Sequence, residues 1–124
     1  MQFLLLVYAD QALLDELSPQ GFDAEMRQCL RHADQLQERG TLLDFKQLES
    51  ASTARSVRVR AGRTRIVDGP FAETKELLAG FNLIEAESID EAVKIAQQFP
   101  WTRYGSIEVR PVRDIDAVRQ RVGA

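Results

Sequence analysis

Apolar residues fill both alternating faces of the stretch QFLLLVY, residues 2–8. A strand with one buried face alternates apolar and polar side chains, so this pattern predicts a central strand covered on both sides. The next apolar pattern has helical spacing and follows Ser18 and Pro19, which suit the N-cap and the first helical position. Gly40 is the predicted stop of this helix. Its apolar stripe consists of Phe22, Met26, Cys29, Leu30, Ala33 and Leu36.

The rest of the chain continues the alternation of strands and helices. Ser88 and Glu91 have the spacing of a capping box and predict the start of a second helix, which Pro100 ends. Val57 and Val59 alternate with polar residues in a predicted β-hairpin. The predicted elements after the first helix are a strand at 41–48, the hairpin at 56–68, a strand at 80–86, the second helix at 89–99, a strand at 106–112 and a weakly helical tail from Asp114.

This order predicts an α+β fold of the ferredoxin-like, split βαβ type with an inserted β-hairpin. Two helices cover one face of a four-stranded sheet, yet the first strand is apolar on both faces. We therefore expect the sheets of two subunits to pack face to face in a homodimer. The alternative is a monomer in which the hairpin and the tail cover the second face. We expect one domain over residues 1–112. Residues 113–124 are expected to form a tail, with a short helix packed on that domain as one form it could take.

Composition narrows the class of protein. The 124 residues suffice for one domain, and the longest apolar run, Phe3–Val7, is far shorter than the ~20 residues of a membrane span. The single cysteine, Cys29, allows no internal disulfide, and no secretory signal precedes the first strand, so we expect a cytoplasmic protein. A net charge of -3 gives no overall attraction for nucleic acid, and we expect no such partner.

The stretch VDGPFAETKELLAGF, residues 67–81, is dense in charge and turn chemistry. Gly69 permits unusual backbone angles and Pro70 fixes its own, which predicts a rigid turn. We expect Phe71 to point inward as an anchor and ETKELL to form one helical turn. Such a turn would hold Asp68, Glu73 and Lys75 in fixed relation. The structural alternative is ordinary turn punctuation.

The segment DGPFAETKELLAGFNLIEAESIDEAVKIAQQFP, followed by GSIEVRPV, closely resembles the YCII-related family, in the branch named for its Asp-Gly-Pro-Phe motif. The resemblance runs from about Met1 to Val112. It implies a ferredoxin-like domain that dimerises through its sheets, as in the dimeric α+β barrels. Some YCII-like relatives have been proposed to be small enzymes with a histidine and an aspartate facing a cleft. Others of this branch occur beside extracytoplasmic-function sigma factors. Many relatives have a histidine where this chain has Tyr104.

His32 is the only histidine, so any histidine-aspartate chemistry must use it. At the boundary of the helical stripe it could act as a general base, oriented by Asp44 or Asp68. The alternative is a partly buried histidine bonded to a backbone carbonyl. We predict Asp68 and His32 as the catalytic pair. The predicted ligand-binding residues are Tyr8, Glu73, Lys75 and Arg110, and the predicted structural turn is Gly69, Pro70 and Phe71.

Other chemistry finds no support in the residues. One histidine, one cysteine and scattered carboxylates predict no metal site, and no phosphate or dinucleotide glycine pattern predicts a cofactor. Five arginines crowd the hairpin and suit either an anionic partner or a solvated strand face. The resulting prediction is a protein that binds or transforms a small polar or anionic metabolite in a cavity of the dimer. The alternative is a non-enzymatic regulatory or protein-interaction module.

Overall fold

The computed structural model describes residues 1–124. Four strands form one antiparallel sheet in the order β2-β5-β1-β6, and β3 and β4 form a separate hairpin. In chain order the main elements alternate as β1-α2-β2-β5-α3-β6, which is the split βαβ arrangement. The antiparallel α+β fold is therefore confirmed. The elements are β1 Gln2–Asp10, α1 Gln11–Asp15, α2 Pro19–Glu38, β2 Leu42–Gln47, β3 Arg55–Arg60, β4 Arg63–Asp68, β5 Glu76–Glu85, α3 Ile89–Gln97, β6 Gly105–Pro111 and α4 Ile115–Val122, with 3-10 turns at Ala51–Thr53 and Pro100–Arg103.

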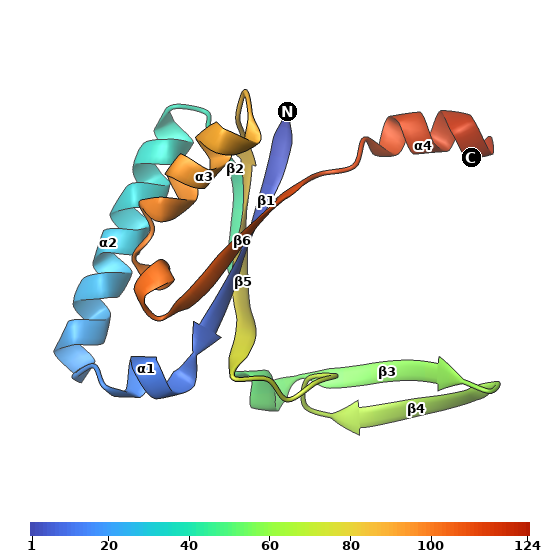
Figure 1. Ribbon diagram of the computed structural model, residues 1–124, viewed down its shortest axis with the longest axis horizontal. Coiled ribbons are helices and arrows are strands. Elements are labelled where there is room, and N and C mark those ends of the chain that lie inside the picture. The colour runs from blue at the N-terminus through green and yellow to red at the C-terminus, as the bar shows by residue number, and fades with distance from the viewer.

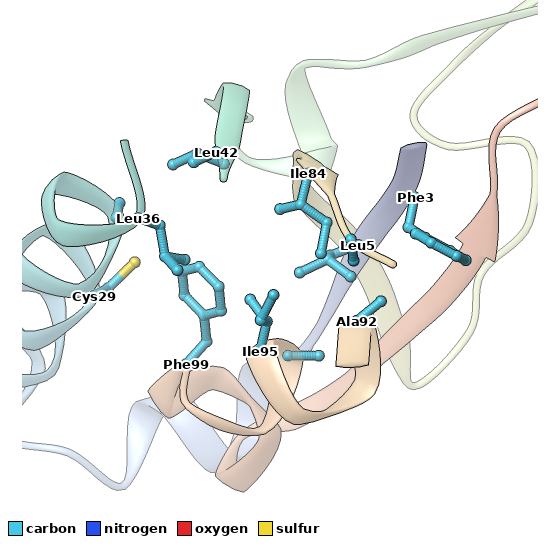
Figure 2. Packing of buried hydrophobic residues seen from close by; sticks show 12 residues of the cluster. Phe3, Leu5, Cys29, Leu36, Leu42, Ile84, Ala92, Ile95 and Phe99 are labelled. Atoms are coloured by element: carbon cyan, nitrogen blue, oxygen red, sulfur yellow. The ribbon is translucent and has the colours of Figure 1, made fainter. Parts of the chain in front are cut away.

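Helices α2 and α3 lie side by side on one face of the sheet (Figure 1). Their apolar sides pack on every second residue of the strands, and Figure 2 shows Phe99 and Leu36 facing Leu5 and Ile84 from the sheet. Complete burial of one leucine, isoleucine or phenylalanine side chain stabilises the fold by about 1.5–3 kcal/mol. The core consists of Phe3, Leu5, Cys29, Ala33, Leu36, Leu42, Ile84, Ala86, Ala92, Ile95, Ala96 and Phe99.

Both helix starts are capped as the sequence predicts. The Ser18 hydroxyl accepts a hydrogen bond from the amide of Gly21 at 3.0 Å, and the Ser88 hydroxyl accepts one from the amide of Glu91 at 3.2 Å. The Glu91 carboxylate reaches back to the amide of Glu87 instead of that of Ser88. Gly40 follows the end of α2 with φ of 74°, as its role as a stop requires. Leu30 departs from the predicted stripe, because its side chain is exposed.

The other face of the sheet has no helix over it (Figure 1). Leu4 lies opposite Leu83 on one side and Arg110 on the other, because β1 pairs with both β5 and β6. Leu6 lies in the same way between Phe81 and Glu108. Since Asp44 and Lys46 flank this face on β2, its centre is apolar and its borders are charged. We call this surface, with Leu4, Leu6, Phe81 and Leu83 at its centre, the open face.

The hairpin of β3 and β4 and the helix α4 both extend away from the sheet (Figure 1). Neither contains a buried residue, and Val57 and Ile66 of the hairpin are 66% and 67% exposed. The structure thus contradicts the alternative in which the hairpin and the tail cover the open face of a monomer. It also shows that the tail helix does not pack on the domain.

The turn after β4 is constrained as predicted at Gly69, whose φ is 93°. Two other expectations for this segment are wrong. Phe71 is 75% exposed, with the Arg58 guanidinium 5.7 Å above its ring and donating to its carbonyl at 2.9 Å. No helical turn follows, because β5 begins already at Glu76 and pairs with the end of β1. Strand pairing with a distant segment here overrides the local helical preference of ETKELL.

Replacing Gly69 by valine is expected to lower the free energy of unfolding by about 1–3 kcal/mol, because a β-branched residue is strained at positive φ. No atom lies within 4 Å of a Cβ built at this position, so the cost comes from backbone conformation alone. Gly69→Asn is the matched control and should cost less, since asparagine tolerates positive φ better. Urea unfolding measures both, and equal stability of all three proteins would contradict the constraint.

Candidate functional site

A cavity of about 210 Å³ lies between α2 and the sheet, and we call it the helix-sheet cavity. Strands β1, β2 and β5 contribute one wall, and α1, α2 and the turn at Pro100–Arg103 contribute the other. Its lining is predominantly hydrophobic, with few polar side chains. This is the usual character of small-molecule sites, in which an apolar wall provides area and a few polar groups fix orientation.

A bulge in β5 forms part of this cavity. Val7 pairs with Gly80 and Tyr8 with Leu78, so Ala79 is the additional residue on β5. Ala79 and Gly80 both line the cavity, where their small size leaves room. Glycine is required at residue 80 for a second reason, since a Cβ there would lie 2.6 Å from the carbonyl oxygen of Lys46 on β2. The close approach of β2 to β5 therefore depends on this residue.

Asn82 contributes a polar side chain to the mostly apolar lining of the cavity. It is only 7% exposed, lies across from Leu5 and Phe45 on the helix side of the sheet, and lines the cavity. Its amide makes no side-chain hydrogen bond within the chain, and its polar atoms are open to the cavity, because the one fully buried side-chain atom without a partner is His32 Nε2. Asn82 therefore offers an accessible amide, unused within the chain, for a hydrogen bond to a molecule in the cavity.

Cys29 and Trp101 meet on the opposite wall. The indole N–H of Trp101 donates to the Cys29 sulfur at 3.2 Å, and both residues line the cavity. Burial raises the pKa of the Cys29 thiol, although the hydrogen bond from Trp101 acts in the other direction. The thiol is therefore protonated near neutral pH and is not an activated nucleophile. The rings of Phe22 and Tyr104 lie 6.1 and 6.4 Å from that of Trp101, so this wall is aromatic.

The structure does not bring His32 and Asp68 together within one chain. The His32 ring packs edge-on against Phe99, at 4.5 Å between centroids. Burial lowers the pKa of His32, and its Nε2 is buried without a partner. The Asp68 side chain is 92% exposed at the end of β4 and lies 3.6 Å from Arg55. Asp44 pairs with Lys46 at 3.7 Å, so neither proposed orienting acid contacts His32.

The predicted ligand-binding residues are dispersed. Arg110 donates from Nε to Glu108 on its own strand at 2.7 Å. Lys75 lies 3.6 Å from the carboxylate of Asp10, a residue that sequence reasoning missed. Asp10 is 3% exposed because it caps α1, where it accepts from the amide of Ala12 at 3.0 Å. Glu73 is exposed.

Tyr8 lines a second cavity of about 610 Å³ at the base of the hairpin, which we call the hairpin-base cavity. Pro70 and Phe71 of the predicted turn contribute to it as well. Its lining includes Glu49 and Glu76 and contains neither lysine nor arginine. An anion would therefore meet no opposite charge among the residues that line this cavity.

No group of three or more His, Cys, Asp or Glu side chains lies close enough together to hold a metal ion. Nor does any helix have the length and apolar character of a membrane span.

Three comparisons with known proteins show what this chain is similar to. A model of the YCII-related domain matches residues 1–116. A relative from Rhizobium meliloti (strain 1021), described as the uncharacterized protein R00369, is 37% identical over 116 residues, which span 90% of this chain and 92% of the relative. Among solved structures, 5-chloro-2-hydroxyhydroquinone dehydrochlorinase (TftG) from Burkholderia phenoliruptrix AC1100, in complex with 2,5-dihydroxybenzoquinone, is 16% identical with a TM-score of 0.49, covering 91% of this chain and 94% of that one. A likeness of that strength carries no conclusion about activity.

Proposed function

The chain belongs to the YCII-related family, and we propose that it binds a small organic molecule in the helix-sheet cavity and does so as a homodimer. The observation that carries the proposal is Asn82, whose amide makes no side-chain hydrogen bond within the chain and lies at the wall of an apolar cavity. The family contributes no substrate to this argument, since the relative is itself described as uncharacterized.

The sequence suggested a small polar or anionic metabolite, with Lys75 beside the Asp-Gly-Pro-Phe motif and Arg110 on the last strand among its ligand-binding residues. In the folded chain both cations face acids, Lys75 beside Asp10 and Arg110 bonded to Glu108. Neither lines the helix-sheet cavity. We therefore propose that the ligand is a small molecule that binds beside Asn82. Binding of anionic compounds at the same cavity is the alternative that experiment must compare with it.

The open face supports the homodimer. Its apolar centre and charged borders have the composition of a protein interface, with a hydrophobic core and a polar rim. Two such sheets pack about 10 Å apart when face to face, which is the architecture of a dimeric α+β barrel. Two further predictions come from the sequence, namely that the chain belongs to the Asp-Gly-Pro-Phe branch of the family and that the protein is cytoplasmic.

A second candidate function is a protein-interaction module in a regulatory system, and the projecting hairpin favours it. Arg58 lies opposite Arg65 and Arg60 opposite Arg63, so four like charges share one face of a two-stranded ribbon. Directly opposed like charges destabilise a strand pair. An acidic partner would relieve that repulsion.

Trp101 provides the test of the cavity, because it is the only tryptophan in the chain and it lines the cavity. A set of small single-ring compounds titrated into the protein should include some that change its fluorescence in a saturable way. Arg58→Ala, on the hairpin, is the matched control and should leave these titrations unchanged. Compounds that raise the melting temperature without any change in Trp101 emission would contradict binding at this site.

A further inference from the structure

We infer that the helix-sheet cavity selects a neutral molecule with one aromatic ring and one hydrogen-bonding group that pairs with Asn82. This inference deepens the proposed function and rests on it. Four properties of the cavity lead to it, namely its volume, its charge, the chemistry of its walls and the position of Asn82.

Volume limits the ligand to a single ring. A dry cavity of about 150 Å³ in a protein core accommodates benzene, whereas sites for drug-sized ligands begin near 300 Å³. At about 210 Å³ the helix-sheet cavity lies between these limits. It has room for a six-membered ring and one small substituent.

Charge excludes an ionic ligand. No aspartate, glutamate or arginine lines the cavity, and the one titratable cation among its residues is Lys46. The Lys46 side chain is 67% exposed and its ammonium lies 3.7 Å from Asp44, so this charge is directed to solvent and to an acid. Transfer of a carboxylate into such surroundings without a countercharge is strongly unfavourable.

The walls favour an aromatic ring over an aliphatic one. Trp101, Phe22 and Tyr104 form the aromatic wall, and aromatic pairs gain about 0.5–1.5 kcal/mol beyond the burial of their area. Two sulfur atoms complete the lining, those of Cys29 and Met26. Sulfur makes favourable contacts with ring edges. Gln47 also lines the cavity, but its amide nitrogen already lies 3.3 Å from the Met26 sulfur.

Asn82 then determines the substituent. Its carboxamide offers both an acceptor and two donors, so it pairs with a hydroxyl, a carbonyl or a second carboxamide. A ring that carries such a group pairs with the Asn82 amide and fills the apolar space at once. Benzene or toluene fills the space alone, which makes these molecules the reference for the contribution of Asn82.

Benzamide and benzoate test the charge, because they have nearly the same shape and differ in ionisation near pH 7. In Trp101 fluorescence titrations we expect benzamide to bind at least about tenfold more tightly than benzoate. Equal or tighter binding of benzoate would overturn the inference and leave the cavity as a binding site. If neither compound nor toluene changes Trp101 emission, the cavity does not bind such molecules, and the proposed function fails together with the inference.

Asn82→Leu tests the hydrogen bond. The substitution keeps the approximate volume and removes the amide, so benzamide should bind at least about tenfold more weakly while toluene binds as before or more tightly. The melting temperature should change little, because the substitution breaks no side-chain hydrogen bond within the chain. Equal weakening of benzamide and toluene would show that the residue only shapes the cavity. Asn82→Ala, which enlarges the cavity, provides the same comparison if the leucine variant does not fold, and there too an equal loss for both compounds would overturn the inference.

Discussion

Replacing Gly105 by alanine is expected to lower the free energy of unfolding by about 3 kcal/mol or more, a decrease of roughly 10 °C in the melting temperature. Gly105 pairs with Ala9 where β6 meets β1, and a Cβ built on it would lie 2.0 Å from the carbonyl oxygen of Tyr8. Because the obstacle is backbone, no side-chain rotation relieves the overlap. The end of β6 must move away from β1.

Ser106→Ala is the matched control for this change. Ser106 is the next residue of β6 and is exposed, so its replacement should change stability by at most about 0.5 kcal/mol. Thermal unfolding followed by circular dichroism compares the three proteins. A Gly105→Ala variant as stable as the Ser106→Ala variant would show that β1 and β6 do not approach as closely as described.

Leu4→Glu is expected to convert the proposed homodimer into a folded monomer. Leu4 lies at the centre of the open face, and a symmetric interface would bury the introduced carboxylate once from each subunit. A cost of at least about 2 kcal/mol for each buried carboxylate weakens the dimer roughly a thousandfold or more in Kd. The fold of each subunit should survive, because Leu4 does not belong to the helix-covered core.

Light scattering at micromolar concentration measures this result. The unaltered protein should have twice the 14.0 kDa of one chain, Leu4→Glu should have the mass of one chain, and Leu4→Met should match the unaltered protein. A monomeric mass for the unaltered protein would remove the homodimer from the account. A dimeric Leu4→Glu variant would place the interface elsewhere than on the open face.

The features that the sequence predicted correctly are those set by local chemistry. The caps Ser18 and Ser88, the stop at Gly40 and the constrained turn at Gly69 each depend on residues within a few positions of one another. Strand β1 was also predicted, since its double apolar pattern is continuous along the chain. The α+β order followed from these elements.

Features set by distant segments were missed. The first residues of β5 were taken for a helical turn because their partner, the end of β1, lies far away in the sequence. The inward anchor was assigned to Phe71, whereas that ring lies beside Arg58 on the hairpin. The role of Asn82 was missed for the same reason, because it too depends on distant segments. Gly80, Asn82 and Ile84 share one face of β5, but only the packing of α2 and α3 shows that this is the covered face.

A signal for the cavity was nevertheless present in the sequence. Within GFNLIE, residues 80–85, a polar asparagine occupies the same strand face as an isoleucine, next to a glycine. A polar residue on the buried face of a strand suggests a binding site, because polar groups on such a face generally have a hydrogen-bond partner. The catalytic pair stays a prediction: His32 was chosen as the only histidine and Asp68 as the acid of the rigid turn, and the two side chains do not meet within one chain.

An NMR titration with benzamide tests most directly the central claim that ligand binds between α2 and the sheet. We expect the side-chain amide of Asn82 and the indole N–H of Trp101 to show the largest saturable shifts in a proton-nitrogen correlation spectrum, while the amides of Val57 on the hairpin and Ala117 on α4 do not move. Largest shifts around Tyr8 and Phe71 at the hairpin-base cavity, or at Arg110 on the open face, with Asn82 unaffected, would contradict it.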